Sequence, residues 1–214
     1  MWKDLVLEAK SLACSRGGRL VFKDLNFSVA GGEAVELRGP NGSGKSSLLR
    51  LLAGLNKPAD GTLNFVIPAK AGISVSAQNT DPRLRGGDDS IGEQAHYIGH
   101  SESLKPSLTV KSNLDFWSSF MGGVPDLKPF RLEKLADDEA RLLSEGQRRR
   151  LALSRLISVK RPVWLLDEPT VGLDQTALTD LRREMASHLS QGGLILAATH
   201  AALGLPNIRT LELA

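Results

Sequence analysis

The feature that most constrains this chain is the glycine-rich stretch at residues 39–46, which reads GPNGSGKS. It follows an apolar segment at residues 34–37 that favours a buried strand. The apolar residues within 48–53 behind it favour a buried helix that ends at Gly54. A strand, a glycine loop and a helix in this order can hold phosphate, because backbone N–H groups and the positive end of the helix face the anion. The stretch, called the phosphate loop below, therefore predicts an α/β fold that binds a nucleotide.

The residue types in the phosphate loop match the parts of a nucleotide. The ammonium group of Lys45 can reach the β- and γ-phosphates, and the hydroxyl of Ser46 can bind Mg²⁺. We expect further ATP contacts from Ser47 and from the rest of the loop, namely Gly39, Pro40, Asn41, Gly42, Ser43 and Gly44. An ordinary glycine-rich turn is the alternative, but such a turn does not need the whole eight-residue match.

A second chemical feature is an acidic pair that follows an apolar run. Val163–Asp167 is apolar up to its last residue, and Glu168 comes next. Such a run suits a strand buried on both faces of a parallel sheet, and ligands collect at the carboxyl end of such strands. Asp167 can hold Mg²⁺ through water, and Glu168 can act as the general base toward an attacking water. An acidic pair alone is more often a solvated loop, but the phosphate loop upstream favours the catalytic interpretation.

Hydrophobic patterning outlines the rest of the chain. Strand patterns occur at residues 25–29, 62–65, 95–99 and 194–198, and helical patterns at residues 109–120, 144–159 and 175–189. We expect one domain, with residues 1–99 and 160–214 forming a β subdomain and a parallel core. Residues 100–159 are expected to form a helical subdomain.

Residues 66–90 lack both patterns and are expected to be an inserted surface loop. The segment is rich in proline and glycine, and its basic and acidic residues balance. Its sequence resembles the translated palindromic repeats of some bacterial genomes. A nucleic-acid contact through Arg83 and Arg85 is the alternative, which the balanced charge and the lack of aromatic residues disfavour.

Composition excludes several classes of protein. The 214 residues include 27 basic and 24 acidic side chains, and the net charge of +3 is too small to indicate nucleic-acid binding. No apolar run reaches the ~18 residues of a membrane span. Residues 1–4 contain charges where a secretory signal would be apolar, and Cys14 is the only cysteine. We therefore expect a protein of the reducing cytosol, without a disulfide framework or a cysteine-ligated zinc site.

Residues 143–147, which read LSEGQ, open the predicted helix at residues 144–159. Ser144 is suited to cap that helix, and taken alone the segment is a capped helix with a basic solvated face at Arg148, Arg149 and Arg150. Together with the phosphate loop and the acidic pair, however, the pentad resembles the LSGGQ signature of ATP-binding cassette (ABC) proteins, and the whole chain resembles that family. The resemblance implies a P-loop NTPase core with an N-terminal antiparallel β subdomain and an inserted α-helical subdomain.

In that family the signature segment completes the nucleotide site of the opposite subunit in an ATP-dependent head-to-tail dimer. The resemblance therefore implies that Ser144 and the backbone of Gly146 contact the γ-phosphate bound by Lys45 of the other subunit. Glu145 stands where the family more often has glycine. Residues 171–174 resemble the loop that crosses the dimer interface, which adds Asp174 to the expected ATP contacts.

Two histidines complete the catalytic set that the resemblance implies. His200 follows the apolar run Leu194–Ala198 and resembles the switch histidine that senses the γ-phosphate. His100 stands where the family's coupling loop normally has glutamine, and an imidazole can still reach the metal-bound water, with a stronger dependence on pH. Arg16 stands where the family has an adenine-stacking aromatic residue, and a guanidinium can also stack on a base. The expected catalytic residues are therefore Glu168, His200 and His100.

Within the family, the chain resembles the ATP-binding subunits of the bacterial haem exporter used in cytochrome c maturation. Residues 97–100, 104–110, 113–117, 146–153 and 161–170 carry this resemblance. It implies an ATPase that lies on the cytoplasmic face of the inner membrane and drives an integral membrane subunit. ATP hydrolysis would then power either haem export or the release of a haem-carrying chaperone.

Two other functions are weighed against this one. A soluble cassette ATPase that acts on nucleic acid or translation would use residues 148–150 as a contact surface, but such proteins usually carry two cassettes or coiled-coil arms. A nucleotide-binding regulator without turnover would not need Lys45, Glu168 and His200 intact. We therefore expect ATP and Mg²⁺ as cofactors and no nucleic-acid partner.

Overall fold

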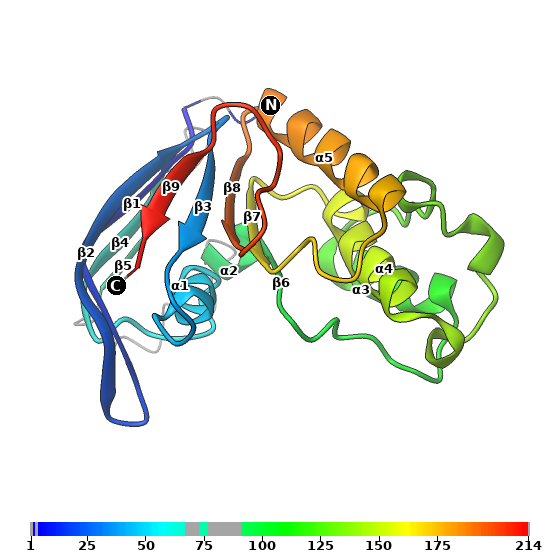
Figure 1. Ribbon diagram of the computed structural model, residues 1–214, viewed down its shortest axis with the longest axis horizontal. Coiled ribbons are helices and arrows are strands. Elements are labelled where there is room, and N and C mark those ends of the chain that lie inside the picture. The colour runs from blue at the N-terminus through cyan, green and yellow to red at the C-terminus, as the bar shows by residue number, and fades with distance from the viewer. Residues whose placement is uncertain (1, 3, 67–72, 77–90, 214) are drawn as a thin grey trace.

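The computed structural model describes residues 2, 4–66, 73–76 and 91–213, and it describes their side chains except at residues 73–76 and 91. Figure 1 shows a parallel and an antiparallel sheet on one side of the molecule and a group of helices on the other. This arrangement confirms the predicted fold class, an α/β core with an antiparallel β part and an inserted helical part.

The parallel sheet positions the predicted chemistry. In the described residues it has five strands, in the order β6 (Ala95–Ile98), β7 (Val163–Asp167), β8 (Leu194–Ala198), β3 (Ala34–Arg38) and β9 (Arg209–Glu212). Every residue of β7 and β8 is buried, as their continuous apolar sequences predict for strands covered on both faces. Because β3, β8 and β7 run parallel, the loops that follow them meet at one edge of the sheet.

The antiparallel sheet has the strand order β2 (Arg19–Ala30), β1 (Val6–Arg16), β4 (Asp60–Val66) and β5 (Ile73–Ser76). The strand patterns at residues 25–29 and 62–65 are confirmed within β2 and β4. The prediction of a loop over residues 66–90 is wrong for Val66, which ends β4 and pairs with Val6 of β1, and for Ile73–Ser76, which pair with β4 as β5. The other residues of that predicted loop lie outside the described residues.

Helices cover both faces of the parallel sheet. The long helices are α1 (Lys45–Leu52), α3 (Val110–Met121), α4 (Glu145–Ser158) and α5 (Gln175–Ser190). Helix α1 packs between the two sheets, α4 and α5 pack on the opposite side of the parallel sheet, and α3 packs against α4 (Figure 1). Successive side chains of β7 point to opposite faces of the sheet. Leu165 packs in the hydrophobic core that contains α1, whereas Trp164 and Leu166 pack in the core that contains α3, α4 and α5.

The helical part is inserted between β6 and β7. A short helix, α2 (Ile91–Gln94), precedes β6, and 3₁₀ turns at Lys128–Phe130, Glu133–Leu135 and Ala140–Leu142 lie between α3 and α4. The predicted helices are confirmed, with Thr109 as the N-cap of α3 and Ser144 as the N-cap of α4. In the described part of the chain, no helix combines the length and the apolar character needed to cross a membrane.

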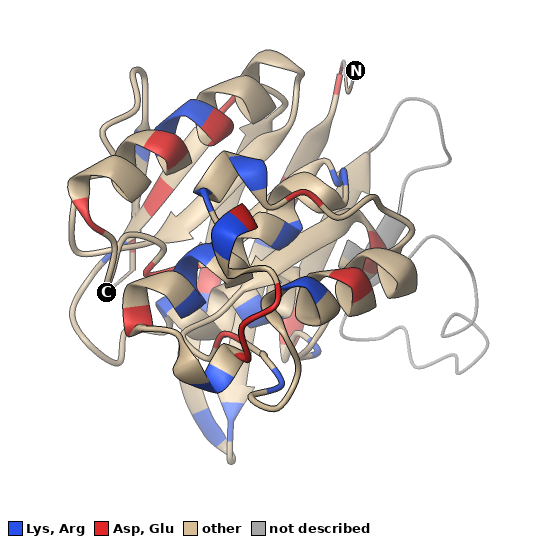
Figure 2. Ribbon diagram, turned by 90° about the vertical axis from the view of Figure 1, so that its right-hand side faces the viewer, with Lys and Arg blue, Asp and Glu red and all other residues tan. Residues whose placement is uncertain are grey.

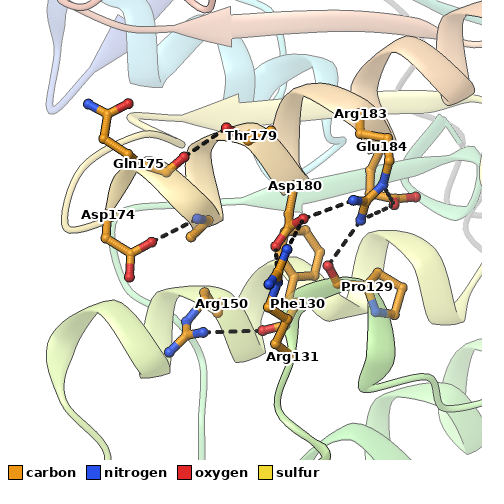
Figure 3. Close-up of polar contacts among 11 residues, drawn as sticks. Pro129, Phe130, Arg131, Arg150, Asp174, Gln175, Thr179, Asp180, Arg183 and Glu184 are labelled. Carbon is orange, nitrogen blue, oxygen red and sulfur yellow. Dashed lines mark hydrogen bonds and ion pairs between the residues drawn. The ribbon is translucent and has the colours of Figure 1, made fainter.

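Charged side chains join this inserted part to α5 (Figure 3). The buried carboxylate of Asp180 accepts hydrogen bonds from Arg131 Nε at 2.9 Å and from Arg183 Nη1 at 2.8 Å. Burial acts to raise the pKa of Asp180, but the two guanidinium groups outweigh it and hold that pKa below its usual value. Arg150 on α4 donates to the carbonyl oxygen of Phe130 at 3.4 Å, so α4 and α5 are both tied to the same turn.

His188 gives the fold a testable dependence on pH. Its buried ring stacks on Trp164 with 4.0 Å between centroids, and its Nε2 lies 3.4 Å from the carbonyl oxygen of Leu194. Burial lowers the pKa of His188 to about 4, so the folded protein keeps the ring neutral. The unfolded chain binds the extra proton below about pH 6.5. The free energy of unfolding therefore falls by at most about 1.4 kcal/mol per pH unit between that pH and the folded pKa.

We expect the urea midpoint of unfolding to fall between about pH 7.5 and about pH 5, and to fall less in a His188→Phe variant. Phenylalanine keeps the ring stack on Trp164 but does not titrate. Part of the fall should remain in the variant, because the buried His96 also has its pKa lowered by burial, to about 3. Equal falls in the two proteins would contradict the role given to His188.

Candidate functional site

One pocket collects most of the predicted nucleotide and catalytic residues. It has a volume of about 780 Å³ and lies where the loops after β3, β7 and β8 meet. Its lining includes Asn41, Gly42, Gly44, Lys45, Ser46, Ser47, His100, Asp167, Glu168 and His200. Arg16, predicted at the adenine-stacking position, also lines it. Residues far apart in the sequence thus converge on one site.

Two glycines of the phosphate loop occupy positions where there is no room for a side chain. Gly39 has φ 143°, and a Cβ there would overlap the carbonyl oxygen of Leu213. Gly44 has φ 98°, and a Cβ there would lie 2.6 Å from Cγ1 of Val21. Gly44 is also the N-cap of α1, so no side chain occupies the N–H groups of the first turn. These groups are left for an anion.

The side chain of Lys45 is held inside the loop. Its Nζ donates to the carbonyl oxygens of Gly39 at 2.7 Å and Pro40 at 3.0 Å, and the residue is almost fully buried. This places the ammonium group beside the main-chain oxygens at the start of the phosphate loop. The contact of Lys45 with phosphate stays a prediction that this position favours.

The donor types fit ATP and Mg²⁺. The buried hydroxyl of Ser43 has no hydrogen-bond partner among the described residues, although Ser43 itself does not line the pocket. Ser46 and Asp167 supply hydroxyl and carboxylate oxygens of the kind that Mg²⁺ prefers. Nowhere in the described ranges do three or more His, Cys, Asp or Glu side chains form a metal-binding group. A magnesium ion would therefore complete its coordination with phosphate oxygens and water.

Glu168 has a strained backbone at the end of β7. Its φ of 49° lies in the left-handed region, which costs a residue other than glycine about 1 kcal/mol or more. Its N–H donates to the carbonyl oxygen of Ala198 at 2.8 Å, and its own carbonyl oxygen accepts from Arg149 Nη2 at 2.7 Å. Strain of this kind at a pocket residue is typical of functional positions.

His200 connects the phosphate loop with Glu168. Its Nε2 lies 3.2 Å from Oδ1 of Asn41 and 3.7 Å from Oε1 of Glu168. Both neighbours are acceptor oxygens, so the tautomer with a proton on Nε2 fits this position. The contact with Asn41 is a feature that the sequence did not predict.

The residues of the signature segment lie away from this pocket. Ser144, Gly146 and Asp174 do not line it. Ser144 caps α4, and Asp174 caps α5 by accepting a hydrogen bond of 2.7 Å from the N–H of Ala177 (Figure 3). A Cβ on Gly146 would lie 2.6 Å from the carbonyl oxygen of Gly172, so the signature segment and the loop at residues 171–174 pack together. The pocket of a single chain therefore lacks the signature segment and Asp174, although Val171 at the start of that loop lines it.

The alternative interpretation of residues 148–150 as a basic solvated face of α4 does not hold for Arg149. Only 5% of this residue is exposed, and its guanidinium points into the protein. The missed signal was the helical period: Arg149 lies on the same face as the buried Ala152, Leu153 and Leu156.

Sequence comparisons find close relatives. A family model described as "ABC transporter" matches residues 22–171. The "Cytochrome c biogenesis ATP-binding export protein CcmA" of Rhodopseudomonas palustris is 48% identical over 96% of this chain and 94% of its own length. The protein of that name from Paramagnetospirillum magneticum is 42% identical over 98% of this chain and 94% of its own length.

Solved structures share the fold. The ATP-binding subunit of an ABC transporter superimposes with a TM-score of 0.74 at 26% identity, covering 91% of this chain and 80% of that chain. An ATP-binding cassette, solved as a dimer in a post-hydrolysis state with ADP and Pi, gives a TM-score of 0.70 at 25% identity. That match covers 91% of this chain and 88% of the other.

Proposed function

The chain belongs to the ABC transporter family, and we propose that it is the ATP-hydrolysing subunit of a transporter that serves cytochrome c biogenesis. The observation that carries this proposal is the pocket in which Lys45, Glu168 and His200 converge. Two relatives named as export proteins of cytochrome c biogenesis match almost the whole chain at 42% and 48% identity. The cargo that the sequence resemblance implies is haem or a haem-carrying chaperone.

Each pocket residue has a role in the proposed reaction. Lys45 and the N–H groups at the start of α1 bind the β- and γ-phosphates. Ser46 and Asp167 would hold Mg²⁺, which supplies positive charge to the phosphates when bound. Glu168 accepts the proton of the attacking water, and His200 senses the γ-phosphate from its place between Asn41 and Glu168.

We further propose that two copies bind ATP head to tail. Ser144 and Asp174 are exposed and lie outside their own chain's pocket, as residues that serve another subunit would. A structural neighbour was itself solved as a dimer with ADP and Pi. A membrane subunit would supply the export path, and the chain would bind it from the cytoplasmic face of the inner membrane.

A role in nucleic-acid binding is not favoured. Arg148 donates to the carbonyl oxygen of Leu143 at 2.6 Å and lies 3.5 Å from Glu102, Arg149 is buried, and Arg150 is bonded to Phe130. These arginines are engaged within the protein. Figure 2 shows basic and acidic positions interspersed along the helices that face the viewer.

Functional replacement in a bacterium that makes c-type cytochromes, after removal of its own copy of this subunit, tests the proposal. The wild-type chain should restore haem-containing c-type cytochromes and purify from solubilised membranes with an integral membrane protein. Lys45→Ala should purify with the same protein without restoring the cytochromes. Restoration by Lys45→Ala would contradict the ATP-driven role, and recovery of RNA in place of a membrane protein would favour the nucleic-acid alternative.

His100→Gln should retain ATP turnover, because glutamine is the residue usual at this position of the family and has a similar polar reach into the pocket that His100 lines. Phosphate release by the wild-type and variant proteins at saturating ATP measures the effect. Loss of turnover in a folded His100→Gln protein that still binds ATP would show that the chemistry needs the imidazole itself.

A further inference from the structure

Arg149 joins three parts of the site through main-chain oxygens. Its Nη1 donates to the carbonyl oxygen of Gly99 at 2.8 Å, directly before His100. Its Nη2 donates to the carbonyl oxygens of Asp167 and Glu168, each at 2.7 Å. The side chain itself comes from the first turns of α4, the helix that the signature segment opens.

Burying the charged guanidinium of Arg149 costs desolvation free energy unless its hydrogen bonds and nearby charges offset that cost. Burial lowers the pKa of Arg149, against the attraction of the nearby Glu102, Asp167 and Glu168 carboxylates. The hydrogen bonds that hold its charge all reach main-chain oxygens of two loops, and its Nε has no partner among the described residues. An apolar side chain could fill the same volume without desolvating a charge. The three directed bonds are therefore the feature that distinguishes arginine here.

Two of these three hydrogen bonds go to the main chain of Glu168, whose backbone is strained, and of the residue before it. Glu168 has both main-chain polar groups engaged: its N–H reaches Ala198, and its carbonyl oxygen accepts from Arg149 and, at 3.3 Å, from the N–H of Val171. The shorter of the two bonds to the carbonyl comes from a charged donor, which makes it the stronger one. The left-handed φ of Glu168 sets the direction in which its carboxylate leaves the backbone.

We propose that Arg149 is a positioning residue for ATP hydrolysis, which holds the main chain of Glu168 and of the His100 loop in register with the signature helix α4. This inference rests on the proposed ATPase function. When the signature segment contacts the nucleotide bound by another subunit, a shift of α4 would be passed on through Arg149. The Glu168 carboxylate of the same chain would then move with α4.

Arg155 offers a matched control on the same helix. It is 6% exposed, close to the 5% of Arg149, and its guanidinium lies 4.8 Å from the ring centroid of Trp117. Its Nε donates to the carbonyl oxygen of Ala152 within α4, at 3.1 Å, and not to either catalytic loop. Removing the charge of Arg155 disturbs the packing of α4 without releasing Glu168.

The test measures kcat and the KM for ATP in the full chain for Arg149→Met, Arg149→Lys and Arg155→Met, with the thermal midpoint of each. Arg149→Met should lower kcat by about 10²-fold, the effect of a small misplacement of a catalytic group, and leave the KM for ATP unchanged. Arg149→Lys should recover only part of kcat, because one ammonium cannot reproduce a planar fork to two loops. Arg155→Met should leave kcat unchanged, because its hydrogen bond stays within α4.

Equal kcat values for folded Arg149→Met and Arg155→Met would overturn the positioning role. If Arg149→Met does not fold, Arg149→Lys decides, because a kcat equal to that of wild type would likewise overturn it. A wild-type protein without ATPase activity would instead refute the proposed function, so the two failures are distinguishable.

Discussion

Replacing Glu168 with glutamine should lower ATP turnover by about 10²- to 10⁴-fold, the contribution typical of a general base. The amide has nearly the shape of the carboxylate, but it cannot accept the proton of the attacking water. ATP binding should be retained, because Lys45 and Ser46 are unchanged and lie on another loop. A dimer that holds ATP should then accumulate, visible by size-exclusion chromatography with ATP and absent without it.

Glu184→Gln is the matched control for this prediction. Glu184 is a glutamate of α5 that pairs with Arg183 and does not line the nucleotide pocket. The control should hydrolyse ATP at the wild-type rate, measured by phosphate release at saturating ATP. Near-normal turnover in Glu168→Gln would remove Glu168 from the role of base.

The residues of the pocket were predictable because their chemistry is local in sequence. The phosphate loop needs glycines at fixed positions, and the structure shows the reason at Gly39 and Gly44, where a Cβ would meet Leu213 and Val21. The acidic pair follows a run of buried residues whose end marks the edge of the sheet. The comparisons confirm the family resemblance that these motifs predicted.

The strands that escaped prediction have physical reasons for their weak patterns. In β1 the alternation of buried residues breaks at Ser11, whose φ is 46°, and the register with β2 shifts there. Strand β9 lies at the edge of the parallel sheet and is largely exposed, so little apolar pattern marks it. Strand β5 is defined by its pairing with β4. Pairing between distant segments leaves no trace in the local sequence.

The side-chain contacts between distant segments were also out of reach. Arg149 stands between two other arginines, and only the fold decides which of the three is buried against Glu168. The contact of His200 with Asn41 joins residues on the loops after β8 and β3. Such contacts depend on the tertiary arrangement, which a motif does not contain.

Mixing the Lys45→Ala and Ser144→Arg proteins should restore ATP hydrolysis that neither variant shows alone. Each alone should be nearly inactive: the first lacks the cation for the phosphates, and in the second a bulky side chain blocks the signature segment. In a head-to-tail dimer, however, the mixed pair has one site that combines an intact Lys45 with an intact Ser144. Random pairing should restore about a quarter of the wild-type sites, since half the dimers are mixed and half their sites are intact.

The geometry of the single chain supports this expectation, because Ser144 caps α4 outside the pocket that holds Lys45. Ser144→Arg loses this cap, at a cost of about 1 kcal/mol, so circular dichroism and ATP binding must first show a folded, nucleotide-binding protein. In the control, the Lys45→Ala partner also carries Ser144→Arg, which leaves no intact site in any pairing. Phosphate release should rise on mixing the two single variants and stay at background in the control. A mixture no more active than its two components would refute the shared site, because a site built within one chain gains nothing from a partner.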